Sequence, residues 1–329
     1  MQTINHPFIE VKHLKKWYPV HAGMFAAMTR RERKFVRAVD DISLEIAAGE
    51  MLGLAGESGS GKTTTGELLL RLQDPTAGEI LLHGANIAFW HGAEVKRFRS
   101  MAQVIFQDPY QTLNPRFTVL HTVMEPLRIH HIGNGGERLE RVIDALHKAE
   151  LRPADAFLHR FPHQLSGGQR QRVAIARAIV LEPRFIVADE PVSMLDVSIR
   201  AGVLNLLRRL KEQMSLTMLY VTHDLSTLRY ICNRTAIMYL GRIAEIGPTE
   251  AVIDNALHPY TQALIAAVPR TDPEARRQPV RIEGEIPDPI DVPRGCRFRP
   301  RCNRAFDACF EEPELKEVAP GHYVACHLY

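Results

Sequence analysis

The sequence reads Gly56-Glu57-Ser58-Gly59-Ser60-Gly61-Lys62-Thr63 over the residues that decide its fold. This stretch matches the pattern G-x-x-x-x-G-K-[ST], in which glycines let consecutive backbone N–H groups turn toward phosphate oxygens without a Cβ clash. Lys62 supplies a cation for the terminal phosphates, and the Thr63 hydroxyl can bind Mg²⁺. The apolar stretch 51–55 predicts a buried strand, and the stretch 63–72 predicts a helix whose positive end faces the anion. This context favours a nucleotide-binding loop over a glycine-rich turn that matches by chance.

A second apolar strand is predicted at 185–188, and it ends in the two carboxylates Asp189 and Glu190. An acidic residue at the carboxyl end of a parallel strand lies at the ligand crevice of an α/β sheet. Asp189 is placed to hold Mg²⁺ through water, and Glu190 is placed to polarise the attacking water as a general base. A surface acidic pair is the alternative interpretation, but the phosphate loop upstream favours the catalytic one. The two motifs together predict a nucleoside triphosphatase.

Strand and helix patterns alternate along the chain, which predicts an α/β fold with a mixed, largely parallel sheet. From about 108 to 165 the pattern becomes helical, and this stretch is predicted to be an inserted helical subdomain. After residue 268 the composition shifts to Pro, Arg, Asp and Cys. We therefore expect a nucleotide-binding domain over residues 1–270 and a small cysteine-containing extension over residues 271–329.

The composition of the 329-residue chain excludes several classes of protein. Lys and Arg total 41 against 38 Asp and Glu, and the net charge of +3 is too balanced for a protein held on nucleic acid by charge. No apolar run reaches the roughly 18–20 residues that a membrane span needs. Residues 1–10 contain no secretory signal. We expect a chain that stays in the cytoplasm and has no nucleic-acid partner.

The motif Leu165-Ser166-Gly167-Gly168-Gln169 decides the kind of nucleotide triphosphatase. Ser166 stands where a helix cap belongs, and Gly167 and Gly168 expose backbone N–H groups at the start of the following helix. The motif resembles the signature of ABC ATPases, and it precedes the carboxylate strand by the spacing that this family requires. A lone motif of this kind could be an ordinary helix start. The resemblance implies that it contacts the γ-phosphate of ATP bound to the opposite subunit.

Further motifs resemble the same family in the same order. Gln107 resembles the Q-loop glutamine that couples Mg²⁺ and water to the transmembrane partner. Asp196 resembles the D-loop aspartate, although Met194 stands where alanine is commoner, a departure that we expect to be harmless. His223 resembles the switch histidine that contacts the γ-phosphate.

An aromatic residue that stacks on adenine is also expected from the resemblance. Tyr18 is the first candidate, and Trp17 is the alternative. The family's site residues then correspond to three groups in this sequence. These are a nucleotide-binding group (Tyr18, Gly56, Glu57, Ser58, Gly59, Ser60, Gly61, Lys62, Thr63, Thr64 and Asp189), a catalytic group (Glu190, His223 and Gln107) and a Mg²⁺ group (Thr63, Gln107 and Asp189).

The resemblance to ABC ATPases covers about residues 8–327. Motifs in the C-terminal third of the chain indicate which subfamily of ABC ATPases the chain resembles. The stretches His258-Pro259-Tyr260-Thr261 and 294–302, with the cysteines that follow, resemble the extension of peptide-type ABC importers. Tyr18-Pro19-Val20 followed by Gly23-Met24-Phe25 is similar to the second ATPase subunit of dipeptide importers. These families take up dipeptides, oligopeptides or nickel.

The resemblance implies a subunit that hydrolyses ATP to power solute import across the cytoplasmic membrane. Its expected partners are two transmembrane permease subunits and a second ATPase subunit, either a different chain or a second copy. An extracytoplasmic solute-binding protein would act indirectly. The expected location is the cytoplasmic face of the membrane, as a peripheral subunit. The sequence does not name the solute.

Four cysteines, Cys296, Cys302, Cys309 and Cys326, crowd the end of the chain with the spacing C-x5-C-x6-C-x16-C. Four thiolates suit Zn²⁺ or a [4Fe–4S] cluster, and the absence of a C-x2-C pair disfavours a zinc ribbon. Some members of the resembled family carry a [4Fe–4S] cluster at this place. Buried free thiols are the third interpretation. For the extension we expect a role in stability or permease docking rather than in hydrolysis.

Two other classes of protein also contain a phosphate loop and are alternatives to a transporter ATPase. A soluble ABC ATPase of DNA repair or translation usually carries tandem cassettes or a long coiled-coil insertion, and this chain has neither. A P-loop kinase would lack the signature motif and the histidine at 223.

Overall fold

The computed structural model describes residues 7–20, 34–268 and 284–329. The chain forms two compact units. The first unit comprises residues up to 45, residues 52–88 and residues from 222 onward, and the second comprises residues 46–51 and 89–221. The predicted domain boundary at 270 and the stretch 23–25 lie outside the described residues.

The first unit contains a four-stranded sheet in the order β2-β1-β4-β5. Strands β1 and β4 are antiparallel, with Ile9 opposite Leu82 and Val11 opposite Ile80. Ile9 and Val11 are buried while Lys12 is exposed, so one face of β1 packs into the core. The four strands are β1 (Ile9–Pro19), β2 (Phe35–Ile46), β4 (Ala77–Leu82) and β5 (Ala85–Asn86).

A second set of strands in the first unit runs in the order β11-β12-β10-β9-β3. The apolar strand β3 (Met51–Ala55) is parallel to β9 (Arg234–Tyr239), and β10 (Arg242–Pro248) is antiparallel to β9. The C-terminal extension contributes β11 (Lys316–Ala319) and β12 (His322–Val324), and β12 pairs with β10. The extension therefore continues a sheet of the nucleotide-binding fold.

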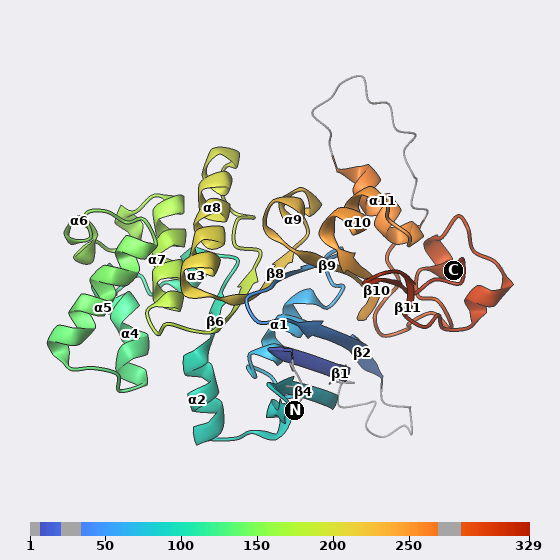
Figure 1. Ribbon diagram of the computed structural model, residues 1–329, viewed down its shortest axis with the longest axis horizontal. Coiled ribbons are helices and arrows are strands. Elements are labelled where there is room, and N and C mark those ends of the chain that lie inside the picture. The colour runs from blue at the N-terminus through green and yellow to red at the C-terminus, as the bar shows by residue number, and fades with distance from the viewer. Residues whose placement is uncertain (1–6, 21–33, 269–283) are drawn as a thin grey trace, which may run out of the picture. The chain divides into compact units, whose positions relative to one another are not determined.

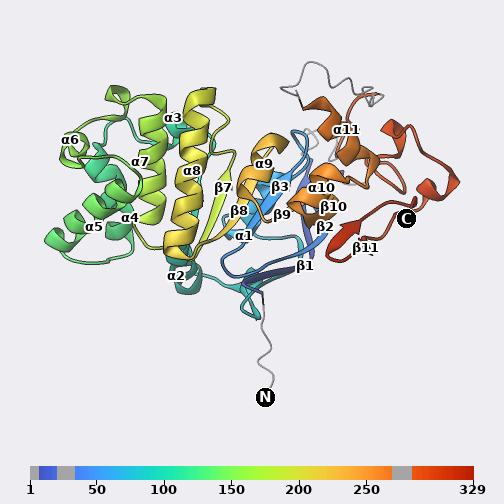
Figure 2. The same ribbon diagram turned by 45° about the horizontal axis from the view of Figure 1, so that its top comes forward.

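Short helices complete the first unit. Helix α1 (Lys62–Leu69) follows the phosphate loop, and Figures 1 and 2 show α10 beside β10. The remaining helices and 3-10 turns are α9 (Leu225–Ile231), α10 (Thr249–Asp254), α11 (Pro259–Ala267), η2 (Ile87–Phe89), η4 (Arg299–Arg301) and η5 (Asp307–Phe310).

The second unit contains three parallel strands with helices around them. Strand β7 (Phe185–Asp189) lies between β6 (Ala102–Ile105) and β8 (Thr217–Thr222). All but the last residue of β7 are buried, as expected for a strand covered on both faces. The helices are α2 (Ala93–Met101), α3 (Pro109–Thr112), α4 (Val119–Ile129), α5 (Gly135–Lys148), α6 (Asp155–Leu158), η3 (Pro162–Gln164), α7 (Gly167–Ile179) and α8 (Val197–Met214).

Helices α4, α5 and α7 pack against one another, side by side in Figures 1 and 2. On α4, Val119, Val123 and Leu127 recur every four residues and are buried, which gives the apolar stripe of a core-facing helix. Helix α5 begins at a capping box formed by Asn134 and Glu137. The predicted helical stretch 108–165 thus contains α3 to α6. The α/β fold with a mixed sheet and a helical region is the one predicted from the sequence.

In the described ranges, no helix combines the length and hydropathy that a bilayer-spanning helix requires.

Candidate functional site

At two positions of the phosphate loop, the backbone conformation and the close neighbours permit only glycine. Gly56 has φ +152°, and a Cβ there would lie 2.1 Å from the carbonyl oxygen of Met238. Gly61 has φ +102°, and its Cβ would lie 2.0 Å from the carbonyl oxygen of Ala38. A side chain at either position would displace the loop from β9 or β2. The motif glycines therefore fix the loop against the strands of the first unit.

Lys62 is held inside this loop. Its ammonium donates hydrogen bonds to the carbonyl oxygens of Gly56 (2.9 Å) and Glu57 (2.8 Å), and Lys62 is only 5% exposed. Thr63 is exposed on the first turn of α1, and the Thr65 hydroxyl donates to the carbonyl of Gly61 at 2.9 Å. A buried ammonium at a helix N-terminus provides the positive charge that a phosphate group requires.

The two aromatic candidates on β1 have different surroundings. The Trp17 indole N–H donates to Asp40 at 2.9 Å, and the guanidinium of Arg37 lies 4.9 Å from the Trp17 ring centroid. The Tyr18 hydroxyl donates to the Gln73 side chain, which fixes the orientation of its half-buried ring. The Lys16 ammonium lies 5.1 Å from the Tyr18 ring centroid, so each of the two rings has a cation over it and these contacts do not choose between them.

In the second unit, the structure brings together two predicted residues that are 83 positions apart. The amide of Gln107 donates a hydrogen bond to the carboxylate of Glu190 at 2.8 Å. Glu190 follows β7 with φ +44°, a left-handed conformation that is strained for a residue with a side chain. Its N–H donates to the carbonyl of Val221 at 2.9 Å, and its carbonyl accepts from the Ser193 hydroxyl at 3.0 Å. The carboxylate is thus held at the end of the parallel strands beside Asp189.

The signature motif forms the start of α7. The Ser166 hydroxyl accepts a hydrogen bond from the N–H of Gln169 (3.3 Å), and the Gln169 side chain accepts from the N–H of Ser166 (3.0 Å). This capping box leaves the serine exposed at the helix N-terminus. A Cβ on Gly168 would lie 2.7 Å from the Ile199 side chain, so this glycine permits the close packing of α7 on α8. Leu165 is buried and anchors the motif.

The remaining predicted residues lie at element ends. Asp196 is the N-cap residue of α8, and its carbonyl accepts from the N–H groups of Ile199 (2.9 Å) and Arg200 (3.0 Å). His223 is exposed and directly precedes Asp224, which caps α9. The phosphate loop, Tyr18 and His223 belong to the first unit. Gln107, Asp189, Glu190, the signature motif and Asp196 belong to the second.

The four C-terminal cysteines lie in one region of the first unit. The pKa of Cys296 is raised to about 11, mainly by burial and with smaller contributions from the neighbouring thiols Cys309 and Cys326. Burial also raises the pKa of Cys302, again with a contribution from Cys309. However, the described residues, which include all four cysteines, contain no group of His, Cys, Asp or Glu that could hold a metal ion. The predicted metal centre therefore gains no support from the arrangement of the thiols.

Sequence reasoning missed three polar side-chain contacts that join the extension to the rest of the first unit. Arg297 pairs with Asp40, Arg301 with Glu57, and His322 with Glu245. Burial raises the pKa of Asp40, but its bonds with Arg297 outweigh this and hold the pKa below its usual range. The partners are separated by 77 to 257 positions, so no local pattern could have revealed them.

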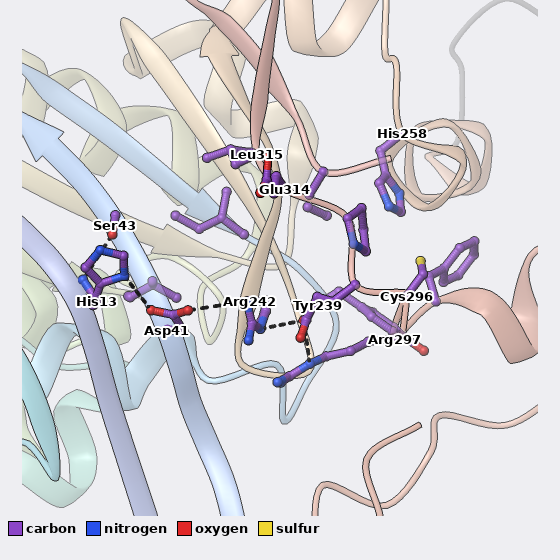
Figure 3. A pocket seen from close by; sticks show the side chains of 17 residues that line it. His13, Asp41, Ser43, Tyr239, Arg242, His258, Cys296, Arg297, Glu314 and Leu315 are labelled. Atoms are coloured by element: carbon purple, nitrogen blue, oxygen red, sulfur yellow. Dashed lines mark hydrogen bonds and ion pairs between the residues drawn. The ribbon is translucent and has the colours of Figure 1, made fainter. Parts of the chain in front are cut away.

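A cavity of about 450 Å³ lies where the extension meets β1, β2 and β10. His13 Nδ1 lies 2.8 Å from Oδ1 of Asp41, and the Arg242 guanidinium lies 3.6 Å from the same carboxylate (Figure 3). Arg242 also pairs with Glu312 at 2.8 Å.

Comparisons with known proteins agree with this geometry. A family model described as ABC transporter matches residues 39–193, and one described as the C-terminal region of oligopeptide/dipeptide transporters matches residues 244–309. A Brucella ovis protein, named provisionally as a peptide import ATP-binding protein, is 49% identical over 321 residues, 97% of each chain. The oligopeptide transport ATP-binding protein AppF of Bacillus subtilis is 44% identical over 325 residues, 98% of this chain and 97% of that protein.

A solved structure has the same fold. It is an ATP-binding cassette seen as a dimer in a post-hydrolysis state with ADP and phosphate. It matches with a TM-score of 0.63 and 32% identity, covering 73% of this chain and 98% of that one. The fold and motifs thus define an ABC-type ATPase, which decides against a P-loop kinase. Within that class, the chain belongs to the family of ATP-binding proteins of oligopeptide and dipeptide ABC importers.

Proposed function

We propose that this chain binds and hydrolyses ATP to drive the import of dipeptides, oligopeptides or a similar small solute. The observation that carries the proposal is the match to peptide-import ATP-binding proteins over nearly the whole chain, including the extension. Residues 1–270 form the nucleotide-binding domain in this proposal, and residues 271–329 form the extension. The chain is an ABC ATPase, so ATP and Mg²⁺ are the expected ligands.

We infer the roles of the site residues from their chemistry. The loop from Gly56 to Thr64 binds the phosphates, and Lys62 compensates their charge. Thr63, Gln107 and Asp189 carry the oxygens that suit Mg²⁺. Mg²⁺, when bound, neutralises charge on the β- and γ-phosphates. Glu190 accepts a proton from the attacking water, His223 contacts the γ-phosphate, and Tyr18 stacks on adenine. The bond from Gln107 to Glu190 supports a shared role for these two side chains.

We also infer that two cassettes act together. In this proposal Ser166 to Gln169 of one cassette contact the ATP that is held by the other. The exposed apolar side chains of Met194 (59%) and Val197 (80%) flank Asp196 and support a protein contact at this place. The second cassette is a different ATPase chain or a second copy.

The other partners follow from the transport function. Two transmembrane permease subunits form the channel, and an extracytoplasmic binding protein delivers the solute to them. The chain is then a peripheral subunit at the cytoplasmic face of the membrane. The homologues' transport names and the matched C-terminal region support these partners.

Transport by the assembled complex tests the proposal. The chain is co-purified with its permeases and second ATPase and placed in vesicles with the binding protein. Uptake of labelled dipeptide, pentapeptide and Ni²⁺ is then measured with and without ATP. We expect ATP-dependent uptake of one peptide class that is lost with Glu190→Gln. Uptake of Ni²⁺ alone, or of none of the three, would contradict peptide import.

A [4Fe–4S] cluster at Cys296, Cys302, Cys309 and Cys326 is a separate proposal. The sequence spacing of the four cysteines supports it, whereas their described arrangement does not form a metal site. Protein purified without oxygen should contain iron and acid-labile sulfide and absorb visible light, and Cys302→Ser should remove all three. Zinc, or four freely reactive thiols, would reject the cluster.

A further inference from the structure

An arginine of the C-terminal extension pairs with a residue of the phosphate loop. Arg301 donates two parallel hydrogen bonds to the Glu57 carboxylate, Nη1 to Oε2 at 2.7 Å and Nη2 to Oε1 at 3.0 Å. The side chain of Arg301 is 7% exposed and that of Glu57 is 23% exposed. Bidentate pairs of this kind fix orientation as well as charge. The extension therefore reaches the loop predicted to bind the phosphates of ATP.

The backbone of Glu57 also contacts a residue from the C-terminal part of the chain. Its N–H donates to the hydroxyl of Tyr260 at 2.8 Å, and Tyr260 is completely buried. Arg301 in turn contacts the hydroxyl of Tyr239 at 3.3 Å. Phe298 packs against both tyrosines, with ring centroids 5.4 Å apart in each case. Both the backbone and the carboxylate of Glu57 thus depend on C-terminal residues.

The charge of Glu57 explains why such a partner matters. An ionised carboxylate in a loop that wraps a triphosphate repels the ligand, and this repulsion is weakly screened at a partly buried position. The hydrogen bonds that Arg301 donates to the Glu57 carboxylate raise the pKa of Arg301 above its ordinary value, so the guanidinium keeps its charge. A permanently charged partner compensates the carboxylate at every physiological pH.

We propose that Arg301 is a positioning residue for ATP binding: it neutralises Glu57 and turns its carboxylate away from the phosphates. The extension then supports the nucleotide site directly, in addition to any role in stability or docking. This inference rests on the proposed role of residues 56–63 as the phosphate loop.

Equilibrium titration of the full-length chain with a fluorescent ATP analogue tests the inference. Arg301→Gln should weaken binding about tenfold, the order of effect of one uncompensated charge near a polyanion. Glu57→Gln together with Arg301→Gln should restore the affinity to within about threefold, because no net charge is then left in the pair. Arg301→Lys, which keeps the charge, should also stay within about threefold.

Controls separate this role from a general loss of structure. Arg294→Gln, at an exposed position of the extension, should leave the affinity unchanged. Thermal unfolding of each variant reports the folded fraction. If Arg301→Gln does not fold, Glu57→Gln alone decides. This variant removes the carboxylate and leaves the positive charge of Arg301 unpaired beside the loop, so it should bind ATP more tightly than the unmodified chain.

The titrations can contradict the role of Arg301 and the phosphate-loop assignment separately. Unchanged affinity in folded Arg301→Gln, no recovery in the double variant, or weaker binding by Glu57→Gln alone would each overturn the inference. Lys62→Ala is titrated in parallel. If Lys62→Ala retained ATP affinity, the phosphate-loop assignment itself would fail.

Discussion

Glu190 combines a predicted role with a conformation that the sequence does not reveal. Its place after an apolar strand predicted a carboxylate at a ligand crevice. Its left-handed φ of +44° and its bond with Gln107 come from the folded chain. Strain of this kind costs about 1–3 kcal/mol and persists only where surrounding contacts impose it. Here the carbonyl of Val221 and the hydroxyl of Ser193 provide those contacts.

Tyr18 should contribute to nucleotide affinity through its ring. We expect Tyr18→Ala to weaken ATP binding about tenfold, within the range of base stacking on an aromatic side chain. Tyr18→Phe keeps the ring and should bind normally. Titration with ATP measures both, and Trp17→Ala is the matched control. A larger loss for Trp17→Ala than for Tyr18→Ala would identify Trp17 as the adenine contact.

His258 should make stability depend on pH. Its Nδ1 accepts the N–H of Tyr260 at 3.0 Å, and burial lowers its pKa from 6.5 to about 4. Between these values the unfolded chain binds a proton that the folded chain excludes. The free energy of unfolding therefore falls as the pH drops below 6.5, by about 2 kcal/mol at pH 5. Its contribution is fully present above pH 6.5.

Urea unfolding at pH 7 and pH 5 measures this effect. His258→Asn keeps a capping acceptor at this position but does not titrate. The unmodified chain should lose about 2 kcal/mol more than the variant between the two pH values. Equal losses would show that His258 is not the group responsible.

Among the elements, those with strong local patterns were predicted best. Strand β3 has the predicted bounds, and the serine cap of α7 was visible in the signature motif. Strands β11 and β12 were missed because they are short, and every residue of β11 is exposed, so no hydrophobic alternation marks it. Their pairing with β10 is set by tertiary contacts, which local propensity does not encode.

The docking of β12 should depend on His322. Its Nε2 lies 2.7 Å from the carboxylate of Glu245, which is fully buried and also accepts the N–H groups of Leu257 and His258 at 2.9 Å. His322→Ala leaves the buried carboxylate without its side-chain partner and should cost about 3 kcal/mol. Urea unfolding measures the loss. The exposed Lys316→Ala should change stability by less than about 0.5 kcal/mol. Equal effects of both substitutions would contradict this role.

For the whole molecule, the sequence predicted the class of protein and the order of its motifs. It did not predict that the extension joins the sheet and the phosphate loop. Glu57 and Arg301 are 244 positions apart, and neither belongs to a periodic pattern. In the sequence, the cysteines were the feature that marked the extension. In the structure, the arginines between those cysteines make the contacts with the nucleotide-binding fold.

The signature motif should act only in the assembled complex. Ser166→Arg places a bulky cation at the exposed start of α7, where the partner's ATP would bind. We expect normal ATP binding by the isolated chain and hydrolysis at least about 100-fold slower in the complex, similar to loss of a transition-state contact. Titration and phosphate release measure the two properties. Loss of ATP binding by the isolated chain, as for Lys62→Ala, would contradict action in trans.

The most direct measurement is the rate of phosphate release by the assembled transporter that carries Glu190→Gln. In this variant an amide replaces the carboxylate that Gln107 contacts. The variant should bind ATP with unchanged affinity and hydrolyse it about 10²–10⁴-fold more slowly, since it lacks the general base. Near-normal hydrolysis would contradict the role of Glu190 and the catalytic site built around it.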